Sequence, residues 1–512
     1  MLNTGCFSAT NLSDMKYFIT LVLMLFFTSI DAENTESKKL IVSYNAEALC
    51  EISKDGKVPL WFTANRFGVT AVKENQFLLR SGLQLHKTFK HKWELKTGVE
   101  LIGRTEPSSK FLVHQAYFDI GRKHVSLSIG AKEQLDLPLD KNRYLTSGWM
   151  VEGFNTRPIP QIRFGINDYI PFAFLKNWFS IKGHLAYGWF TDGKWQEEFV
   201  GNDHDFVKDV LYHSKSLMFR LGNKEKFPLD FEFGLHMAGQ FGGDLYHKDS
   251  EGNTNLVLNL PKGIKSYWKA FLPQSSDNNS LLGEQLNYEG NVMGSWNFAL
   301  KFYQNKWKAR IYLEHYFEDS SQILWEYGPW KDGQLGVEIT LPENKIISSI
   351  LWEGMSTKDQ TSSVFVRDKE GPFFDISMRG NDNYYNNYIY QAWQSYGLGM
   401  GNPLVPGPIY KNDGSLNFCS NRVVAHHLGI QGNPSHSVNW RILTSYAKHW
   451  GTYMNPLDKM REQLSFLLEI NYLPAWAKGW KLGYSFGKDG GNYLGKSVGS
   501  MLTLCKKGDF SL

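Results

Sequence analysis

Leu229-Asp230-Phe231-Glu232-Phe233-Gly234-Leu235-His236-Met237 is the stretch that decides the fold. Its odd-numbered residues are apolar, and the residues between them are polar or small. Successive side chains of a β-strand point to opposite sides, so this segment has an apolar face and a polar face. Strands of a membrane-spanning barrel have this pattern, with the apolar face toward lipid and the polar face toward the lumen.

The same alternation, bounded by turn residues, recurs along the chain and predicts an antiparallel transmembrane β-barrel of about eighteen strands over residues 61–512. The strands are expected at 61–70, 77–87, 93–102, 113–120, 125–131, 162–166, 180–190, 211–221, 229–240, 296–303, 307–317, 335–341, 346–353, 423–431, 438–446, 464–472, 480–486 and 498–505.

The lengths of the links between these strands give the barrel an orientation. Short links alternate with long ones, and the long links lie near 132–161, 191–210, 241–295, 318–334 and 354–422. Outer-membrane barrels have short periplasmic turns, long external loops and an even number of strands. A soluble, secreted all-β protein is the alternative, but a sandwich or propeller has no reason to alternate its loop lengths. We therefore expect the long links to be external.

Composition narrows the function classes. The net charge of +4 is too balanced to indicate a nucleic-acid partner. A mean hydropathy of -0.37 argues against a helical membrane protein. The aromatic content of 15% suits the aromatic girdles of a barrel, although a large soluble β-protein or a carbohydrate enzyme also reaches it.

The N-terminus has the pattern of a secretory signal peptide. Met15-Lys16 precedes an apolar run over 18–27, and Ala32 follows at a plausible cleavage point. We expect residues 1–32 to be an upstream extension and a signal peptide with Met15 as the start, the alternative being an uncleaved anchor. Residues 33–60 are expected to form a periplasmic segment before the barrel.

No metal or cofactor site is expected. The four cysteines, Cys6, Cys50, Cys419 and Cys505, lack metal-ligand spacing, and a Cys50–Cys419 pair stays open. His426 and His427 are adjacent, so on one strand they face opposite sides.

Two long links contain candidate glycan-binding residues, because aromatic rings stack on sugars while amides bond hydroxyl groups. In 354–422 the aromatic and amide residues are dense, which indicates a glycan surface, a folded plug, or packing against the barrel rim. In 318–334 acids and aromatics are interleaved, and Glu318, Asp319, Glu326 and Asp332 could also supply a carboxylate pair for glycoside hydrolysis, a weaker indication. The candidate polysaccharide-binding residues are Trp325, Tyr327, Trp330, Asp332, Tyr384, Tyr385, Tyr388, Tyr390, Trp393 and Arg422.

Several of these segments, taken in order, resemble the Wzi family of capsule-assembly outer-membrane barrels in its Bacteroides-like form. The matching stretches are Gly153-Phe154-Asn155-Thr156-Arg157-Pro158-Ile159-Pro160-Gln161, the region from Glu314-His315 to Gly336 with Asp332-Gly333-x-x-Gly336, Tyr384-Tyr385-Asn386-Asn387 with Trp393, Gly397 and Gly401-Asn402-Pro403, and residues 421–429.

The resemblance implies a monomeric outer-membrane barrel with a non-enzymatic, lectin-like role. Its partners would be capsular polysaccharide and outer-membrane lipid, and it would help to assemble or attach the capsule at the cell surface. The small periplasmic helical bundle of the enterobacterial members cannot be identified here, because 33–60 is too short for several helices. The alternative functions are a porin or glycan export channel, followed by an outer-membrane enzyme.

Overall fold

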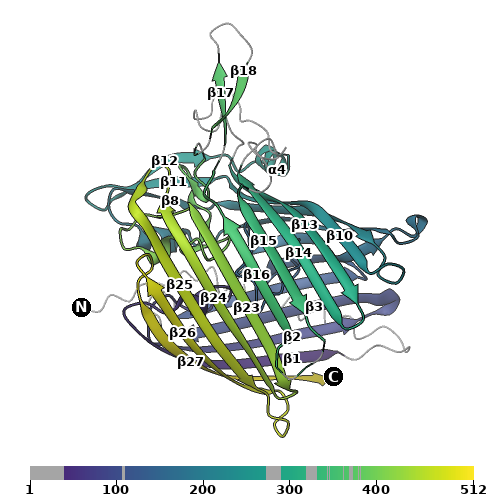
Figure 1. Cartoon of the computed structure of the whole chain (residues 1–512). Helices are drawn as coiled ribbons and strands as arrows, with labels where there is room; N and C mark the ends of the chain where they lie inside the picture. The colour runs from purple at the N-terminus through teal and green to yellow at the C-terminus, as the bar shows by residue number, and fades with distance from the viewer. Residues whose placement is uncertain are drawn as a thin grey trace.

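The computed structural model describes residues 40–512 except for 106–109, 273–289, 319–330, 343, 345, 361, 368–372, 379 and 381. Its main feature is a closed antiparallel barrel of 18 strands, in which each strand pairs with its neighbours in the sequence order and β1 pairs with β27 (Figure 1). The barrel strands are β1 Ile41–Lys54, β2 Gln76–Thr88, β3 Trp93–Arg104, β4 Phe111–Arg122, β5 Val125–Ala131, β6 Gln161–Pro171, β7 Phe179–Trp189, β9 Leu211–Gly222, β10 Leu229–Phe241, β13 Asn291–Gln304, β14 Trp307–Glu318, β15 Gly333–Thr340, β16 Ser349–Ser356, β23 Val423–Ser435, β24 Val438–Gly451, β25 Pro456–Tyr472, β26 Trp480–Gly491 and β27 Ser497–Ser511.

The remaining elements lie in the links. They are the helices α2 Leu60–Thr63, α3 Gly193–Phe199 and α4 Ile264–Phe271, the 3-10 turns η1 Lys90–Lys92, η2 Ala173–Leu175 and η3 Pro408–Tyr410, a sheet of β8 His204–Lys208, β11 Gly243–Lys248 and β12 Thr254–Leu260, the hairpin β17 Ser362–Arg367 and β18 Phe373–Met378, and the short pairs β19 Asn386–Asn387 with β20 Gln391–Ala392 and β21 Gln394–Ser395 with β22 Leu398–Gly399. The β17–β18 hairpin projects beyond the barrel at the end that has the long links (Figure 1). None of the helices in the described residues is long and apolar enough to span a membrane.

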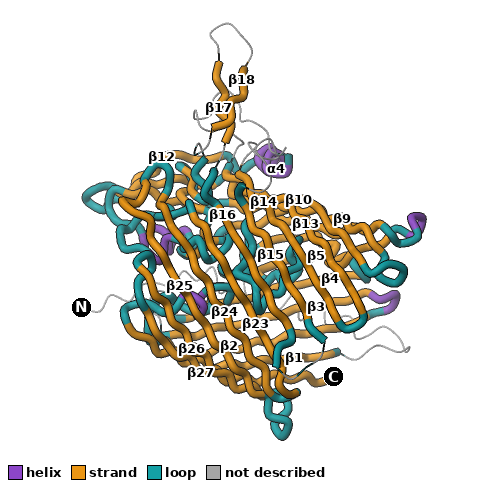
Figure 2. The backbone as a smooth tube through the Cα atoms, in the orientation of Figure 1, coloured by secondary structure: helices purple, strands orange, loops and turns teal. Residues whose placement is uncertain are grey.

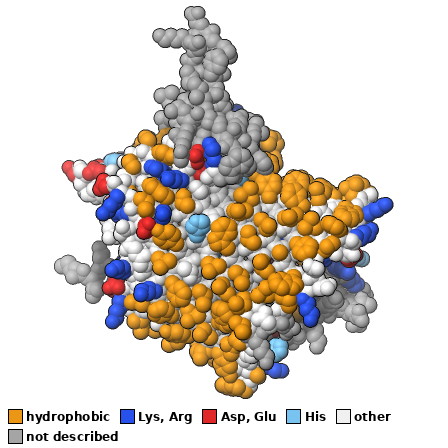
Figure 3. Space-filling model, viewed as in Figure 1, with side chains coloured by type: hydrophobic (Ala, Val, Ile, Leu, Met, Phe, Trp, Pro, Cys, Tyr) orange, Lys and Arg blue, Asp and Glu red, His pale blue; other side chains and the backbone are white. Residues whose placement is uncertain are grey.

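The alternation predicted for the strands is present in the wall. In β10, Asp230 and Glu232 are buried toward the lumen at 3% and 1% exposure, whereas Phe231 between them is 38% exposed on the outside. The face of the barrel seen in Figure 3 is covered with apolar side chains over much of its height. This surface is the lipid-facing band that a membrane barrel requires.

Exposed tryptophans mark the short-link end of the barrel. A girdle lies where the short links join the strands, and it consists of Trp93, Trp178, Trp307, Trp476 and Trp480. Such girdles mark a membrane–water interface. The girdle places the short-link end at a membrane–water interface, and we keep the predicted orientation, with the short links periplasmic and the long links external, because outer-membrane barrels share this arrangement.

The first predicted strand, 61–70, was wrong, and so was the periplasmic assignment of 33–60 over its described part, residues 40–60; the predicted signal peptide in 1–32 lies outside the described residues. Ile41–Lys54 is a barrel strand that pairs with both β2 and β27, while 61–70 contains the end of α2 and irregular backbone. The alternation in β1 is weak because Ala46 and Ala48 lie on its outer face and the inward Leu49 is apolar. Trp61 and Phe62 are apolar because they are buried within the protein, at 2% and 0% exposure, and not because they lie on a strand.

Three long links fold into the barrel instead of standing in solvent. We call residues 55–75, 132–160 and 382–422 the plug, and their loops cross the interior behind the front strands (Figure 2). Plug residues share one apolar cluster with inward residues of the wall such as Leu78, Ile102 and Leu351. The prediction that 132–161 is an external loop is therefore wrong, and residues 382–422 favour the folded-plug alternative for the link 354–422.

The periplasmic half of the lumen is polar and partly open. A cavity of about 660 Å3 lies there, lined by charged and polar wall residues and by Lys132, Glu133 and Leu135 of the plug. Arg80 of β2 pairs across it with Glu100 of β3 and with Glu133 of the plug, at 2.8 and 2.7 Å. Plug residues therefore pack in the external half of the lumen, and ion pairs beside this cavity link the wall to the plug.

Candidate functional site

Wall carboxylates hold the plug segment 132–160 in place. Glu314 on β14 accepts hydrogen bonds from Lys141 Nζ at 2.6 Å and from the Met150 amide at 2.9 Å. Both charged side chains are fully buried, at 0% and 1% exposure. A buried ion pair with this geometry leaves neither charge unpaired, so it fixes where the plug contacts the wall.

A second wall carboxylate clamps the adjacent turn of the plug. Glu353 on β16 accepts hydrogen bonds from Thr146 Oγ1 and from the Ser147 amide, each at 2.6 Å. The ring Nε2 of His427 on β23 lies 2.6 Å from the Leu145 carbonyl oxygen. Three neighbouring plug residues are therefore attached to two separate strands.

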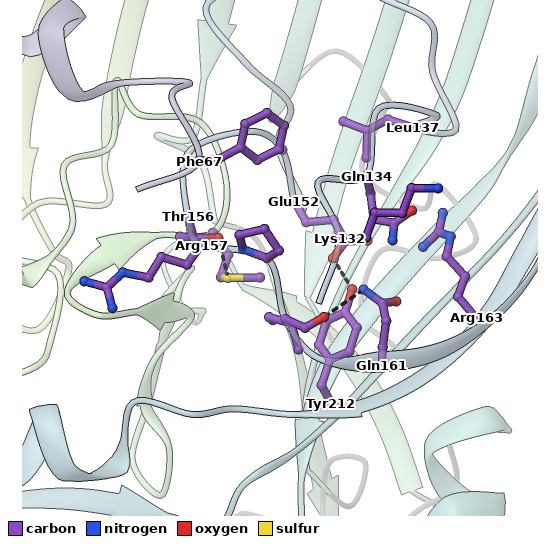
Figure 4. Close-up of a pocket in the computed structure, with 14 residues that line it drawn as sticks. Phe67, Lys132, Gln134, Leu137, Glu152, Thr156, Arg157, Gln161, Arg163 and Tyr212 are labelled. Atoms are coloured by element: carbon purple, nitrogen blue, oxygen red, sulfur yellow. Dashed lines mark hydrogen bonds between the residues drawn. The ribbon is translucent and has the colours of Figure 1, made fainter. Parts of the chain in front are cut away.

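A third attachment surrounds Glu152 beside a small cavity of about 50 Å3 (Figure 4). Its Oε1 accepts from Ser214 Oγ at 2.7 Å and lies 3.0 Å from His236 Nε2, while Tyr212 OH donates to Oε2. Burial acts to raise the pKa of Glu152. The interaction with His236 and the hydrogen bonds from Tyr212 and Ser214 outweigh burial and lower the pKa to about 2. Glu152 is thus an anion that these wall residues stabilise.

The same cluster is one of two groups of possible metal ligands in the described residues, the other being Glu100, His114 and Glu133. Ligand atoms of Glu152, His184 and His236 lie within 4.8 Å of one another. The Ser214 hydroxyl sits among them, 2.8 Å from His184 Nε2 as well as 2.7 Å from Glu152 Oε1. The possible ligand atoms of this cluster are thus already paired in hydrogen bonds with one another and with Ser214, so the cluster attaches the plug to the wall.

Asp332, a candidate glycan ligand in the sequence, is a structural anchor. It is 0% exposed and accepts hydrogen bonds from the amides of Asp359 and Gln360, at 2.9 and 2.7 Å, and from Tyr384 OH at 3.2 Å. Burial raises its pKa to about 6. Glu318 is also buried and accepts from the Tyr385 amide, so these two carboxylates support the plug and do not form an open catalytic pair.

The aromatic run in the last long link is part of the plug interior. Tyr384, Tyr385, Tyr390 and Trp393 are between 0% and 2% exposed. Trp393 Nε1 donates to the Val151 carbonyl at 2.6 Å. These rings cannot stack on an external sugar in this structure, which favours the plug and packing alternatives over the glycan surface.

The other sequence candidates are scattered. Tyr388 is 53% exposed, and Arg422 lies with its guanidinium 4.1 Å from the centre of the Tyr453 ring. Trp325, Tyr327 and Trp330 lie outside the described residues, as do Asp319 and Glu326. Cys50 and Cys419, whose pairing the sequence left open, are free cysteines.

The external end contains a cleft of about 350 Å3 that the sequence analysis did not predict. Aromatic rings form one side of it. Trp195 and Phe199 lie one turn apart on α3 with their rings stacked at 4.7 Å, and Tyr396 of the plug lies 6.3 Å from Trp195. The lining residues are Gly56, Lys57, Gly68, Thr70, Ala71, Val72, Lys73, Arg104, Arg157, Trp195, Phe199, Tyr396, Leu398, Ile409, Lys411 and Asn412.

Five cations and no carboxylates are among the described residues that line this cleft. The Arg157 side chain points away from the small cavity beside Glu152 (Figure 4), and its guanidinium group lies 3.8 Å from the centre of the Tyr396 ring. Burial lowers the pKa of Lys57 and of Lys411, where nearby Asp413 opposes the shift. The cleft therefore combines flat apolar rings with a positive field, which suits an anionic ligand that has apolar faces.

Sequence reasoning missed the cleft because its residues come from four separate links and the end of β3. The local signal was the Trp195–Phe199 pair, four residues apart, inside the predicted loop 191–210. That spacing places two rings on one side of a helix. No spacing within one link shows that Arg157 and Tyr396 join them.

No family model and no curated protein matches this sequence. Among solved structures the chain is similar to Wzi of Escherichia coli, an outer-membrane protein involved in group 1 capsule assembly and a carbohydrate-binding β-barrel, with a TM-score of 0.55 and 14% identity over 92% of this chain and 85% of Wzi. Pseudomonas aeruginosa OpdK with vanillate gives a TM-score of 0.46 and 6% identity over 92% of this chain and 99% of OpdK, too low to carry an argument. The likeness to Wzi shows the fold, and by its fold the chain is a Wzi-like outer-membrane β-barrel.

Proposed function

We propose that this protein is a non-enzymatic, lectin-like barrel that holds an acidic capsular polysaccharide at the cell surface. The observation that carries the proposal is the external cleft, in which Trp195, Phe199 and Tyr396 face a field of lysine and arginine side chains. The carbohydrate-binding and capsule roles of Wzi, the neighbour in fold, agree with it.

The chemistry of the cleft matches an acidic glycan better than a neutral one. Aromatic rings offer flat apolar surfaces to the apolar faces of pyranose sugars. Guanidinium groups such as that of Arg157 form charge-assisted, bidentate hydrogen bonds with carboxylate groups. A chain of uronic acids presents both features at every repeat, so stacking and ion pairing would act together.

The test is polysaccharide binding to the purified barrel in detergent. Alginate, a polyuronate, is compared with the neutral glucan dextran by calorimetry. We expect Trp195→Ala and Tyr396→Ala each to weaken alginate binding by about 1–3 kcal/mol, on the scale of base–aromatic stacking. The matched control is Trp476→Ala, which removes an 85% exposed tryptophan at the periplasmic end.

Charge variants separate electrostatic attraction from stacking. Lys73→Gln in the cleft should weaken alginate binding and reduce its dependence on salt, since exposed charges are screened by salt. Lys123→Gln, in an exposed periplasmic turn, is the control. Equal binding of dextran and alginate, or the same affinity in the cleft variants and the controls, would reject the proposed site.

A cell-based experiment tests the capsule role. Deleting the gene should release polysaccharide into the medium and reduce the cell-bound capsule that staining detects. Unchanged cell-bound capsule with none shed would refute it, even if the cleft binds alginate.

Transport is the second candidate function, favoured by the cavity of about 660 Å3 in the periplasmic half of the lumen. Conductance in planar bilayers discriminates between the two functions. Steady open-channel currents would support a porin or export channel, whereas a plug held at Glu152, Glu314 and Glu353 predicts a closed pore.

A further inference from the structure

Helix α4 packs against the outside of the barrel at its external end. Tyr187 OH of β7 donates to the Tyr267 carbonyl at 2.9 Å, and Lys215 Nζ of β9 donates to the Ala270 carbonyl at 3.3 Å. The ring of Phe241 on β10 lies 5.2 Å from that of Tyr267. Three neighbouring strands therefore support the helix.

These wall residues point outward, because their neighbours point into the lumen. Ser214, next to Lys215, binds Glu152 of the plug. Gln240, next to Phe241, donates to the Ala392 carbonyl of the plug at 3.3 Å. Side chains alternate along a strand, so α4 covers the lipid-facing side of the wall and not the lumen.

The face of α4 that turns away from the wall is apolar. Ser266 and Ala270 are buried, at 4% and 7% exposure, whereas Ile264, Trp268 and Leu272 are 85%, 56% and 43% exposed. Ile264 and Trp268, four residues apart, lie on one side of the helix, and Leu272, the residue that follows α4, extends this exposed apolar stripe.

Lysines border this stripe. Lys265 is exposed and follows Ile264, and Lys269 follows Trp268 one turn later. A short helix with an apolar stripe beside cationic side chains has the pattern of helices that lie in the plane of a membrane interface.

The stripe continues the lipid-facing surface of the barrel. Trp189 at the external end of β7 is 49% exposed, and Leu217 and Leu221 of β9 below the helix are 47% and 45% exposed. Tryptophan is enriched at membrane–water interfaces. Lipid that covers the outer wall therefore reaches the helix from below, and the stripe on α4 is the next apolar surface that it meets.

We propose that α4 is an interfacial anchor, which inserts Ile264, Trp268 and Leu272 into the outer leaflet and binds the phosphate groups of lipid headgroups through Lys265. Continuity with the wall identifies lipid as the occupant, and the exposed Lys265 selects anionic headgroups. The anchor would fix the tilt of the external loops over the membrane.

The test places an environment-sensitive NBD label at position 268, through Trp268→Cys in a background whose native cysteines are replaced by serine. The full-length barrel is reconstituted in vesicles of phosphatidylcholine with or without phosphatidylglycerol. The matched control is Lys194→Cys on α3, another external helix, where the native side chain is 86% exposed. Heat-modifiable migration on gels selects folded variants, and Ile264→Cys provides a second labelled site that retains the tryptophan.

We expect doxyl-labelled lipid to quench the label at 268 or 264 strongly, and iodide to quench it several-fold less than at 194. Phosphatidylglycerol should deepen the insertion, and Lys265→Glu should abolish that gain. If iodide quenches the labels at 268 and at 264 as strongly as the label at 194, the proposed anchor is overturned. If the depth of insertion changes neither with phosphatidylglycerol nor with Lys265→Glu, the proposed binding of lipid phosphate groups is overturned.

Discussion

Lys141→Met is expected to loosen the plug while the barrel wall stays folded. In the native protein, Lys141 Nζ donates to Glu314 Oε2, to the Gln334 side chain at 2.6 Å and to the Gly148 carbonyl at 2.8 Å. Methionine keeps most of the volume of the side chain but removes all three hydrogen bonds. Glu314 then keeps the Met150 amide as a donor and loses its cation.

The cost follows from burial. Because both partners are at most 1% exposed, water cannot replace the missing charge. Removing one partner of a buried ion pair costs about 3–5 kcal/mol. At about 1.4 kcal/mol per factor of ten, opening of this part of the plug should rise more than about a hundredfold.

Hydrogen exchange in detergent measures this opening residue by residue. The Met150 amide, bound to Glu314, should exchange much faster in Lys141→Met, whereas the Ser147 amide, bound to Glu353, should change less. The double variant with Glu314→Gln should recover much of the protection, because a neutral amide can accept from Met150 and donate to the freed Gly148 carbonyl. Native-like exchange at Met150 in the single variant would show that this ion pair does not hold the plug.

Three further outcomes are expected. The pKa of Asp332 is about 6 in the folded protein and 3.8 in the unfolded chain, so Asp332 contributes about 3 kcal/mol to the free energy of unfolding at low pH, and this contribution is lost as the pH rises through 6. Asp332→Asn should therefore flatten the pH dependence of thermal unfolding, and an unchanged pH dependence would refute the raised pKa of Asp332. Gly397→Ala should weaken alginate binding, since Gly397 has a φ of +79° and an added Cβ would lie 2.6 Å from Trp195 Cη2; calorimetry beside a native-like melting curve checks this, and undiminished binding would contradict it. Lys141→Met should give current openings in planar bilayers that the native protein lacks, and currents already steady in the native protein would instead favour transport.

The strands of the barrel wall could be predicted because the alternation of apolar and polar residues is visible within the sequence of each strand. In β10 the alternation of Phe231 and Glu232 reports the two environments directly, lipid and lumen. β1 was missed because its lumen-facing Leu49 contacts the apolar plug and not water. A strand that borders a plug loses the polar half of its alternation, so the pattern fails where the interior is filled.

The plug was harder to predict because link length does not say on which side of the rim a loop folds. Lys141 in a long link looks like a solvated residue, and its partner Glu314 lies on a strand far away in sequence. The dense aromatics from Tyr384 to Trp393 did carry a signal, which fitted a plug as well as a glycan surface. Four of these aromatic side chains are only 0% to 2% exposed, which favours the plug over the glycan surface.

The plug also shapes the cleft. Asp192, which precedes α3, is 1% exposed, and its Oδ2 accepts hydrogen bonds from Gln394 Nε2 and from the Tyr396 amide, each at 3.1 Å. This carboxylate connects the helix that presents Trp195 to the plug segment that presents Tyr396. The distance between the two rings is therefore fixed by a structure anchored inside the barrel. A rigid aromatic surface loses less conformational entropy on binding than free loops do, so a filled lumen would strengthen binding in the proposed cleft.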